Sequence, residues 1–170
     1  EADKTEWKRC PKCQARIRTE GLADEMQLQS FFTRRIEAIL SRLGKRLIGW
    51  DEIIEGGLPP RTAVMSWRGT QGGLEAARSG HDVVMAPTSN CYIDYYQGDP
   101  GLEPMAIGAY LPLEKVYSFE PTPDSLTPAE VRHILGTQVN LWTEYVPDPA
   151  KAEYMIFPRV AAIAEVGWSD

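Results

Sequence analysis

The sequence predicts an α/β fold in which about four parallel strands alternate with helices. Short, almost continuously apolar runs alternate with longer runs whose apolar residues recur three and four positions apart. Continuous apolar runs are typical of parallel strands that are covered by helices. An open doubly wound sheet and a barrel both fit this pattern. Because four strands in 170 residues fall short of a complete (β/α)₈ barrel, the barrel interpretation is half of such a barrel.

The helices and strands are expected in a definite order. Residues 1–24 are polar and predict a loop, and residues 26–43 predict an amphipathic helix that ends at Gly44. Thr127 suits the N-cap of a later helix, and Pro158 predicts a break in the last one. The other expectations are strands at 46–50, 62–67, 82–87 and 138–144, helices at 72–80, 127–135 and 148–168, and an extended loop at 88–126.

The overall charge argues against some classes of partner. The chain has a net charge of -6 and a pI near 5.0, whereas nucleic acids and anionic membrane surfaces attract basic patches. No run of about 18 or more apolar residues is present, so no membrane-spanning helix is expected. The composition is that of a globular protein, and the length suits one domain with its own core.

Cys10 and Cys13 form the motif CPKC, which is compatible with half of a zinc site or with a redox pair. A structural zinc site needs four ligands, often supplied by a second Cys or His pair. Cys91, His81 and His133 remain, and none of them is paired at such a spacing. We therefore expect a structural turn or a disulfide at this motif, and neither a metal site nor a cofactor.

Aromatic and polar side chains follow the predicted strands where each strand ends. They are Trp50, Asp51 and Glu52 after the first strand, Trp67 and Arg68 after the second, Tyr92, Asp94, Tyr95 and Tyr96 after the third, and Trp142, Thr143 and Glu144 at the end of the fourth. The carboxyl ends of parallel strands meet at one side of a sheet, where barrel enzymes have their active sites. Indole rings stack on pyranose rings and carboxylates accept hydrogen bonds from hydroxyl groups, so this pattern favours a sugar-binding pocket.

Each of these residues also has a purely structural interpretation. A single Trp at a strand end is often a core or rim residue, and Asp51 or Glu52 suits a helix N-cap. Arg68 suits an ion pair with a neighbouring carboxylate, and Tyr95 and Tyr96 suit packing within a loop. The repetition of the aromatic-plus-polar pattern at three strand ends favours the functional interpretation.

Four motifs together resemble the second half of the catalytic barrel of glycoside hydrolase family 20, the β-N-acetylhexosaminidases. They are IGWDEIIEGGL, AVMSWRGTQGG, NCYIDYYQ and NLWTEYV, in this order. The opening EADKTEWKRCPKCQARI and the closing FPRVAAIAEVGWS also resemble family segments, so the resemblance covers residues 1–170. It implies the C-terminal half of a (β/α)₈ TIM barrel, with barrel strands five to eight in one partial catalytic domain.

The resemblance also implies roles for individual residues. Glu1 lies where the family has its general acid, and the Asp that assists this acid would directly precede Glu1. Tyr92 matches the tyrosine that donates a hydrogen bond to the acetamido carbonyl group of the substrate. Asp51 and Glu52 are expected at the pocket rim or bracing its loops. Trp50, Trp67 and Trp142 match indole walls of the sugar pocket, and Asp94 and Glu144 match carboxylates that bind sugar hydroxyl groups.

The implied activity is that of a retaining exo-β-N-acetylhexosaminidase, which removes terminal N-acetylglucosamine or N-acetylgalactosamine from glycans or chitooligosaccharides by substrate-assisted catalysis. The partner is then a carbohydrate, and the family suggests a secreted, periplasmic or surface-associated protein. Barrel strands one to four supply further site residues in the family, so little or no turnover is expected from residues 1–170 alone. The exposed sheet edges of a half-barrel are expected to favour self-association. The alternative is a non-catalytic carbohydrate-binding half-barrel.

Overall fold

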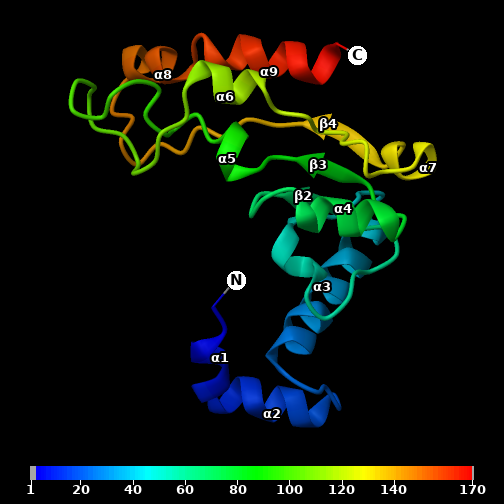
Figure 1. The fold of residues 1–170 in the computed structure, drawn as a ribbon. Helices are drawn as coiled ribbons and strands as arrows, with labels where there is room; N and C mark the ends of the chain where they lie inside the picture. Colours follow the sequence, from blue (N-terminus) through cyan, green and yellow to red (C-terminus); the bar gives the residue numbers. More distant parts are fainter. Residues whose placement is uncertain (1–2, 170) are drawn as a thin grey trace.

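The computed structural model describes residues 3–169 and contains a sheet of four parallel strands (Figure 1). The strands are β1 (Ile48–Trp50), β2 (Ala63–Ser66), β3 (Val83–Met85) and β4 (Ile134–Thr137). They lie in chain order, and every neighbouring pair is parallel. Within residues 3–169, β1 and β4 each pair with one strand, so both edges of this sheet are open.

Helices connect the strands and flank the sheet. They are α1 (Thr5–Arg9), α2 (Pro11–Thr19), α3 (Glu25–Arg42), the 3-10 helix η1 (Asp51–Ile54), α4 (Gln71–Arg78), α5 (Thr88–Cys91), α6 (Leu113–Tyr117), α7 (Pro128–Val131), α8 (Pro149–Ile156) and α9 (Arg159–Trp168). The alternation of strands and helices is the one that the sequence predicts. In the described part of the chain, no helix has both the length and the apolar character needed to cross a bilayer.

The prediction of a loop at residues 1–24 is wrong for the described part of that segment, because α1 and α2 occupy most of it. Pro11 stands at the first position of α2, where its missing amide hydrogen is not needed. Residues such as Lys, Arg, Gln and Ala favour helix without producing an apolar stripe, which is why periodicity did not predict these helices. The amphipathic helix expected at 26–43 is confirmed as α3.

The fourth strand lies earlier in the chain than expected. The prediction placed it at 138–144, but β4 ends at Thr137, and Asn140 continues the pairing through an isolated bridge to Tyr92. The preceding apolar residues are compatible with both helix and strand, because a short apolar run does not distinguish the two. Pairing with β3 decides the outcome in favour of strand.

Several helix boundaries also differ from the prediction. The helix expected at 127–135 ends at Val131, although Thr127 is its N-cap as predicted and forms a capping box with Glu130. The segment expected to be an extended loop, 88–126, contains the short helices α5 and α6. The predicted break at Pro158 is confirmed, because it separates α8 from α9.

The centre of the sheet is covered by α4. Apolar residues of this helix and of the strands form part of one buried cluster: Leu74, Ala76, Ala77, Val64, Val83 and Met85. Gly73 allows the close approach, since a Cβ atom there would lie 2.8 Å from the Met85 sulfur and 3.0 Å from Ser66 Cβ. The apolar face of α4 therefore lies against the strands that carry the candidate site.

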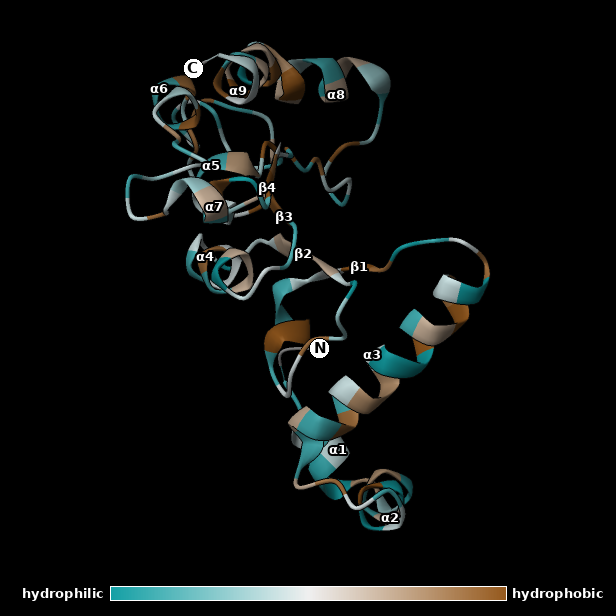
Figure 2. Cartoon of the chain, turned by 90° about the vertical axis from the view of Figure 1, so that its right-hand side faces the viewer, coloured by the Kyte–Doolittle hydropathy of each residue, from teal (hydrophilic) through white to brown (hydrophobic). Residues whose placement is uncertain are grey.

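In contrast, α3 is attached through its polar face. The Ser30 hydroxyl donates a hydrogen bond to the Gly57 carbonyl at 2.6 Å, and the Gln29 amide donates one to the Glu52 carbonyl. Apolar and polar residues both occur along α3 (Figure 2), and its apolar residues Phe32 and Leu43 are largely exposed. Because an apolar helix face normally covers a core, α3 carries a surface suited to further protein layers.

Candidate functional site

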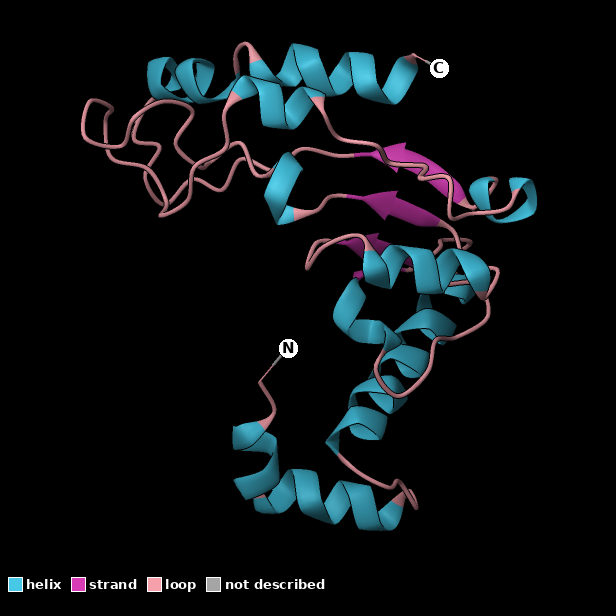
Figure 3. Cartoon of the chain, viewed as in Figure 1, coloured by secondary structure: helices cyan, strands magenta, loops and turns pink. Residues whose placement is uncertain are grey.

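The carboxyl ends of the strands point to the same side of the sheet, and long connections gather there (Figure 3). Trp50 is the last residue of β1, and Trp67 directly follows β2. Tyr92 is the C-cap residue of α5, and Trp142 lies beyond the end of β4. Strands that end together thus bring four aromatic residues from distant parts of the sequence to one side.

These four aromatic side chains and Glu52 line a cavity of about 230 Å³. The ring centroid of Trp50 lies 6.3 Å from that of Trp67 and 6.3 Å from that of Trp142. The rings of Trp67 and Tyr92 are stacked with their centroids 6.4 Å apart. Such distances are typical of attractive aromatic pairs, so the walls support one another. A hollow with apolar walls and few polar groups suits a sugar ring.

Asp51 and Glu52 hold the Trp67 wall in place. Glu52 accepts a hydrogen bond from the Trp67 indole nitrogen at 2.9 Å, and Asp51 accepts one from the Trp67 backbone amide at 3.1 Å. Asp51 also accepts hydrogen bonds from the backbone amide of Arg68 and, at 2.6 Å, from its side chain. The expected bracing role and the expected ion pair of Arg68 are confirmed. The helix N-cap interpretation is wrong, because Trp50 is the N-cap of η1.

Ion pairs connect this brace with the N-terminal helices. Arg68 also donates a hydrogen bond to Glu55 at 2.8 Å, and Lys4 Nζ donates one to Glu55 at 3.0 Å. Burial alone would raise the pKa of Glu55, but the hydrogen bonds from Arg68 and Lys4 outweigh it and lower the pKa. Lys4 is the N-cap residue of α1, so the start of α1 is fixed near the strand ends. Sequence reasoning missed Lys4 and Glu55, because no local pattern relates residues 51 positions apart.

Asp94 is buried near the aromatic cavity without a hydrogen bond from another described residue. It is 3% exposed, and neither of its carboxylate oxygens has a side-chain partner within residues 3–169. Burial raises the pKa of Asp94 to about 6, with a further contribution from the Glu144 carboxylate. The charge of Asp94 also raises the pKa of Tyr92, which lines the cavity. Buried polar groups normally have partners, so this carboxylate is suited to accept hydrogen bonds from a ligand.

Tyr92 presents a hydroxyl group rather than a phenolate to the cavity. Burial raises the pKa of Tyr92 to about 12, although a hydrogen bond with the Trp142 side chain lowers it. At neutral pH the phenol is therefore protonated and can donate a hydrogen bond to a ligand oxygen.

Glu144 and Asp94 do not line the aromatic cavity itself. Glu144 and Thr143 instead line a neighbouring groove of about 350 Å³, and they directly follow Trp142, which belongs to the cavity. The structure thus brings the three predicted indole walls and Tyr92 together and places the two predicted carboxylates beside them. Glu1 lies outside the described residues.

Arg159 supports the segment that follows α5, and sequence reasoning did not identify it. It is fully buried and donates hydrogen bonds to carbonyl oxygens at 2.6 to 3.0 Å; these belong to Ile93, Tyr95, Leu111 and Met155. Burial lowers the pKa of Arg159 to about 10. The sequence feature that could have identified Arg159 is that it is the single charged residue within the otherwise apolar run FPRVAAIA.

The motif CPKC forms the junction between α1 and α2. Cys10 is both the C-cap residue of α1 and the N-cap residue of α2, so the structural turn is confirmed. Cys10 and Cys13 are free thiols, as is Cys91, so the alternative of a disulfide does not hold in this structure. Among residues 3–169, no group of three or more His, Cys, Asp or Glu side chains is arranged to hold a metal ion.

The model of the glycosyl hydrolase family 20 catalytic domain matches residues 1–170. The chain belongs to this family. The β-hexosaminidase of Porphyromonas gingivalis is 51% identical to it over 170 residues, which are 99% of this chain and 22% of the length of that relative. The β-hexosaminidase of Vibrio furnissii is 36% identical over 95% of this chain and 27% of its own length.

Solved structures agree with this family assignment. The family 20 exo-β-N-acetylglucosaminidase of Vibrio harveyi, solved in complex with N-acetylglucosamine, matches with a TM-score of 0.84 and 37% identity over 96% of this chain and 26% of its own. The chitobiase of Flavobacterium johnsoniae matches with a TM-score of 0.82 and 30% identity over 98% of this chain and 24% of its own. The family structures are TIM barrels, so the expected half-barrel is confirmed. The chain spans about a quarter of the length of these relatives.

Proposed function

We propose that the chain is the sugar-binding half of the barrel of a retaining exo-β-N-acetylhexosaminidase, which releases terminal N-acetylglucosamine or N-acetylgalactosamine from glycans or chitooligosaccharides. The observation that carries the proposal is the buried Asp94 carboxylate, which has no hydrogen-bond partner within residues 3–169 and lies beside a cavity walled by aromatic rings. Sugar hydroxyl groups supply the missing donors, and the rings supply stacking faces. The β-hexosaminidase relatives support this assignment.

In the proposed complex, a terminal 2-acetamido sugar lies among Trp50, Trp67 and Trp142. The indole rings exclude water and hold the acetamido group near the anomeric carbon C1 of the sugar. Asp94 and Glu144 accept hydrogen bonds from hydroxyl groups of the same sugar. The bracing of Trp67 by buried carboxylates keeps one of these walls fixed before the sugar arrives, which lowers the entropy lost on binding.

The proposed reaction uses the acetamido group of the substrate as the nucleophile. Its carbonyl oxygen attacks C1, the bond from C1 to the leaving oxygen breaks, and a cyclic oxazolinium ion forms; water then opens this ion with net retention. The Tyr92 hydroxyl donates a hydrogen bond to the attacking oxygen and so fixes its position. Glu1 is the proposed general acid, which protonates the leaving oxygen and then removes a proton from the attacking water.

A second candidate function is carbohydrate binding without hydrolysis. It is favoured by the location of the aromatic cavity, Asp94 and Glu144, all of which lie in the described half-barrel. Both candidates predict that residues 1–170 bind a 2-acetamido sugar. They differ in what happens when the other half of the barrel is present.

Calorimetric titration of the 170-residue chain with N-acetylglucosamine tests the sugar binding that both candidate functions predict. We expect measurable binding, weaker binding of glucose, and a loss of affinity of about tenfold or more in Trp142→Ala, since aromatic contacts carry much of the binding free energy. Trp168→Ala is the matched control, because Trp168 is 92% exposed at the end of α9 and should leave affinity unchanged. Equal affinity for glucose and N-acetylglucosamine, or equal effects of both substitutions, would contradict the pocket assignment.

A protein that carries residues 1–170 together with the other four strands of its barrel separates the two candidates. We expect this protein to hydrolyse 4-nitrophenyl N-acetyl-β-glucosaminide, and Glu1→Gln to lower kcat by roughly 10²–10⁴-fold, as expected for the loss of a general acid. Residues 1–170 alone should show no turnover. Binding without turnover in the completed barrel would favour the second candidate.

A further inference from the structure

Cys10 and Cys13 form a pair of thiols at the start of α2, away from the aromatic cavity. Cys10 is the N-cap residue, Pro11 is the first helical residue, and Cys13 follows within the first turn. The side chain of an N-cap residue lies beside the third residue of the helix, so Cys10 and Cys13 are neighbours at the start of α2. Both residues are partly exposed, which leaves the pair accessible to small molecules.

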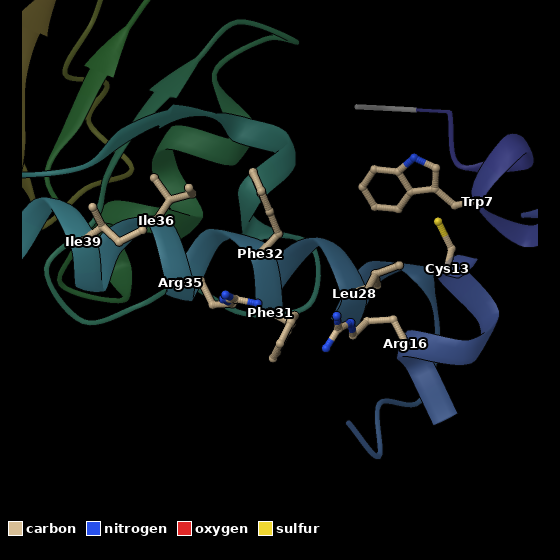
Figure 4. Close-up of a pocket in the computed structure, with 9 residues that line it drawn as sticks. All are labelled: Trp7, Cys13, Arg16, Leu28, Phe31, Phe32, Arg35, Ile36 and Ile39. Carbon is tan, nitrogen blue, oxygen red and sulfur yellow. The ribbon is translucent and has the colours of Figure 1, made fainter. Parts of the chain in front are cut away.

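The two thiols interact, and their environments differ. The nearby backbone amide of Cys13, and then its side chain, lower the pKa of Cys10. The neighbouring Cys10 side chain, followed by burial, raises the pKa of Cys13. The Cys13 sulfur points toward the Trp7 indole at the edge of an apolar groove of about 610 Å³ between α3 and the α1–α2 pair (Figure 4). One thiol is therefore suited to ionise first, and its neighbour keeps a proton beside an apolar wall.

Cys91 provides an internal contrast. It is fully buried, its sulfur lies 3.5 Å from the Thr137 hydroxyl oxygen, and burial raises its pKa to about 11. A thiol in this environment is unreactive, because the thiolate is the nucleophile. The same chain thus holds an exposed, interacting pair of thiols and a buried structural thiol.

We propose that Cys10 and Cys13 are a redox-active dithiol that exchanges with low-molecular-weight disulfides, with Cys10 as the attacking thiol and Cys13 as the resolving thiol. The Cys10 thiolate attacks one sulfur of the disulfide and forms a mixed disulfide, and the other half leaves as a thiolate that takes up a proton. The Cys13 thiolate, after losing its proton, attacks the Cys10 sulfur and releases the second thiol. The protein dithiol is oxidised to a disulfide, and one small disulfide is reduced to two thiols.

The proposed disulfide would close the junction between two helices. Cys10 ends α1 and begins α2, and the Gln14 side chain of α2 already donates a hydrogen bond to the Trp7 carbonyl of α1 at 3.0 Å. A bond from Cys10 to Cys13 fixes the first turn of α2 beside Trp7. Oxidation should therefore change the fluorescence of Trp7 without unfolding the chain, and this change should be absent in Trp7→Phe.

The test is alkylation and mass spectrometry of the 170-residue chain in buffers with different ratios of reduced to oxidised glutathione. We expect iodoacetamide at pH 7 to modify Cys10 at least about tenfold faster than Cys91, as for a thiol with a lowered pKa at a helix N-terminus. With oxidised glutathione, the peptide containing Cys10 and Cys13 should lose two hydrogen atoms and become resistant to alkylation. Equal reactivity of Cys10 and Cys91, or a Cys10–Cys13 peptide that stays reduced at every ratio, would overturn the proposal.

Single substitutions test the order of attack. Cys13→Ser should accumulate a glutathione adduct on Cys10, because no resolving thiol remains, whereas Cys10→Ser should form an adduct on Cys13 several-fold more slowly. Adducts that form at the same rate in both variants would contradict the assigned roles. The alkylation of the unsubstituted chain decides the main proposal even if a variant fails to fold. The outcome is independent of the glycosidase proposal, since neither readout requires a sugar.

Discussion

α3 and α4 are both amphipathic helices beside the same sheet, yet they bury opposite faces. α4 places Leu74, which is 8% exposed, in the core of the sheet, whereas α3 leaves Leu43 67% exposed. The contacts that hold α3 are hydrogen bonds from polar residues such as Ser30. Contacts within the described half-barrel therefore do not explain the apolar pattern of α3. A complete family barrel has further layers, and the open face of α3 is suited to them.

The largest expected effect compares two leucines. Leu74→Ala should lower the free energy of unfolding by roughly 2–4 kcal/mol, because it leaves a cavity in the core under α4. Leu43→Ala, the same change on the open face of α3, should alter it by less than about 0.5 kcal/mol. Urea denaturation of both variants provides the measurement. Similar losses for both leucines would mean that the face of α3 is covered in solution.

The second prediction concerns the loop that holds α3. Gly56 has a φ angle of +84°, and a Cβ atom there would overlap the carbonyl of Met26 in α3, so Gly56→Ala should cost roughly 2–3 kcal/mol. Gly57 has a φ angle of +94° with no described atom within 4 Å of such a Cβ, so Gly57→Ala should cost about 1–2 kcal/mol. Thermal unfolding of both variants separates the steric overlap from the backbone strain. A greater loss in Gly57→Ala would show that Gly56 is not tightly packed on α3.

The third prediction tests whether polar contacts attach α3. Ser30→Ala removes a buried donor to the Gly57 carbonyl and should cost about 1–2 kcal/mol. Ser41→Ala removes an exposed hydrogen bond to Glu37 on the same helix and should cost no more than about 0.5 kcal/mol. Urea unfolding curves of the two variants check the difference. If Ser30→Ala is neutral, α3 is held by something other than its polar face.

The fourth prediction concerns Phe32→Ser, a substitution that should change stability least but should clearly reduce self-association. We propose that residues 1–170 self-associate through the open apolar face of α3 and the open strand edges. Phe32→Ser should shift sedimentation velocity profiles toward monomer while changing stability little, because Phe32 is exposed. Ala38→Ser, a change at another exposed position of α3, should leave the profile as it was. An unchanged profile in Phe32→Ser would remove this face from the proposed interface.

The sequence predicted the fold class, α3 and the residues at the strand ends because these features have local signatures. Trp50, Trp67 and Trp142 follow apolar runs, and parallel strands necessarily bring such positions to one side. The position of β4 was not predictable, since pairing with β3 chose among residues that suit helix and strand equally. The partners of Lys4 and Arg159 depend on contacts between distant segments, which no local pattern encodes.

The ion pair between Lys4 and Glu55 also has a consequence for thermal motion. Lys4 is almost completely buried at the start of α1, whereas α2 and the adjoining end of α3 project away from the sheet (Figure 1). We therefore expect α1 and α2 to take part in different slow opening motions, with the boundary at Cys10, which follows the last residue of α1. In these motions α1 should move together with the strand ends, and α2 should move separately. In amide hydrogen exchange, α1 should share the protection of η1 despite its short length, and α2 should exchange earlier.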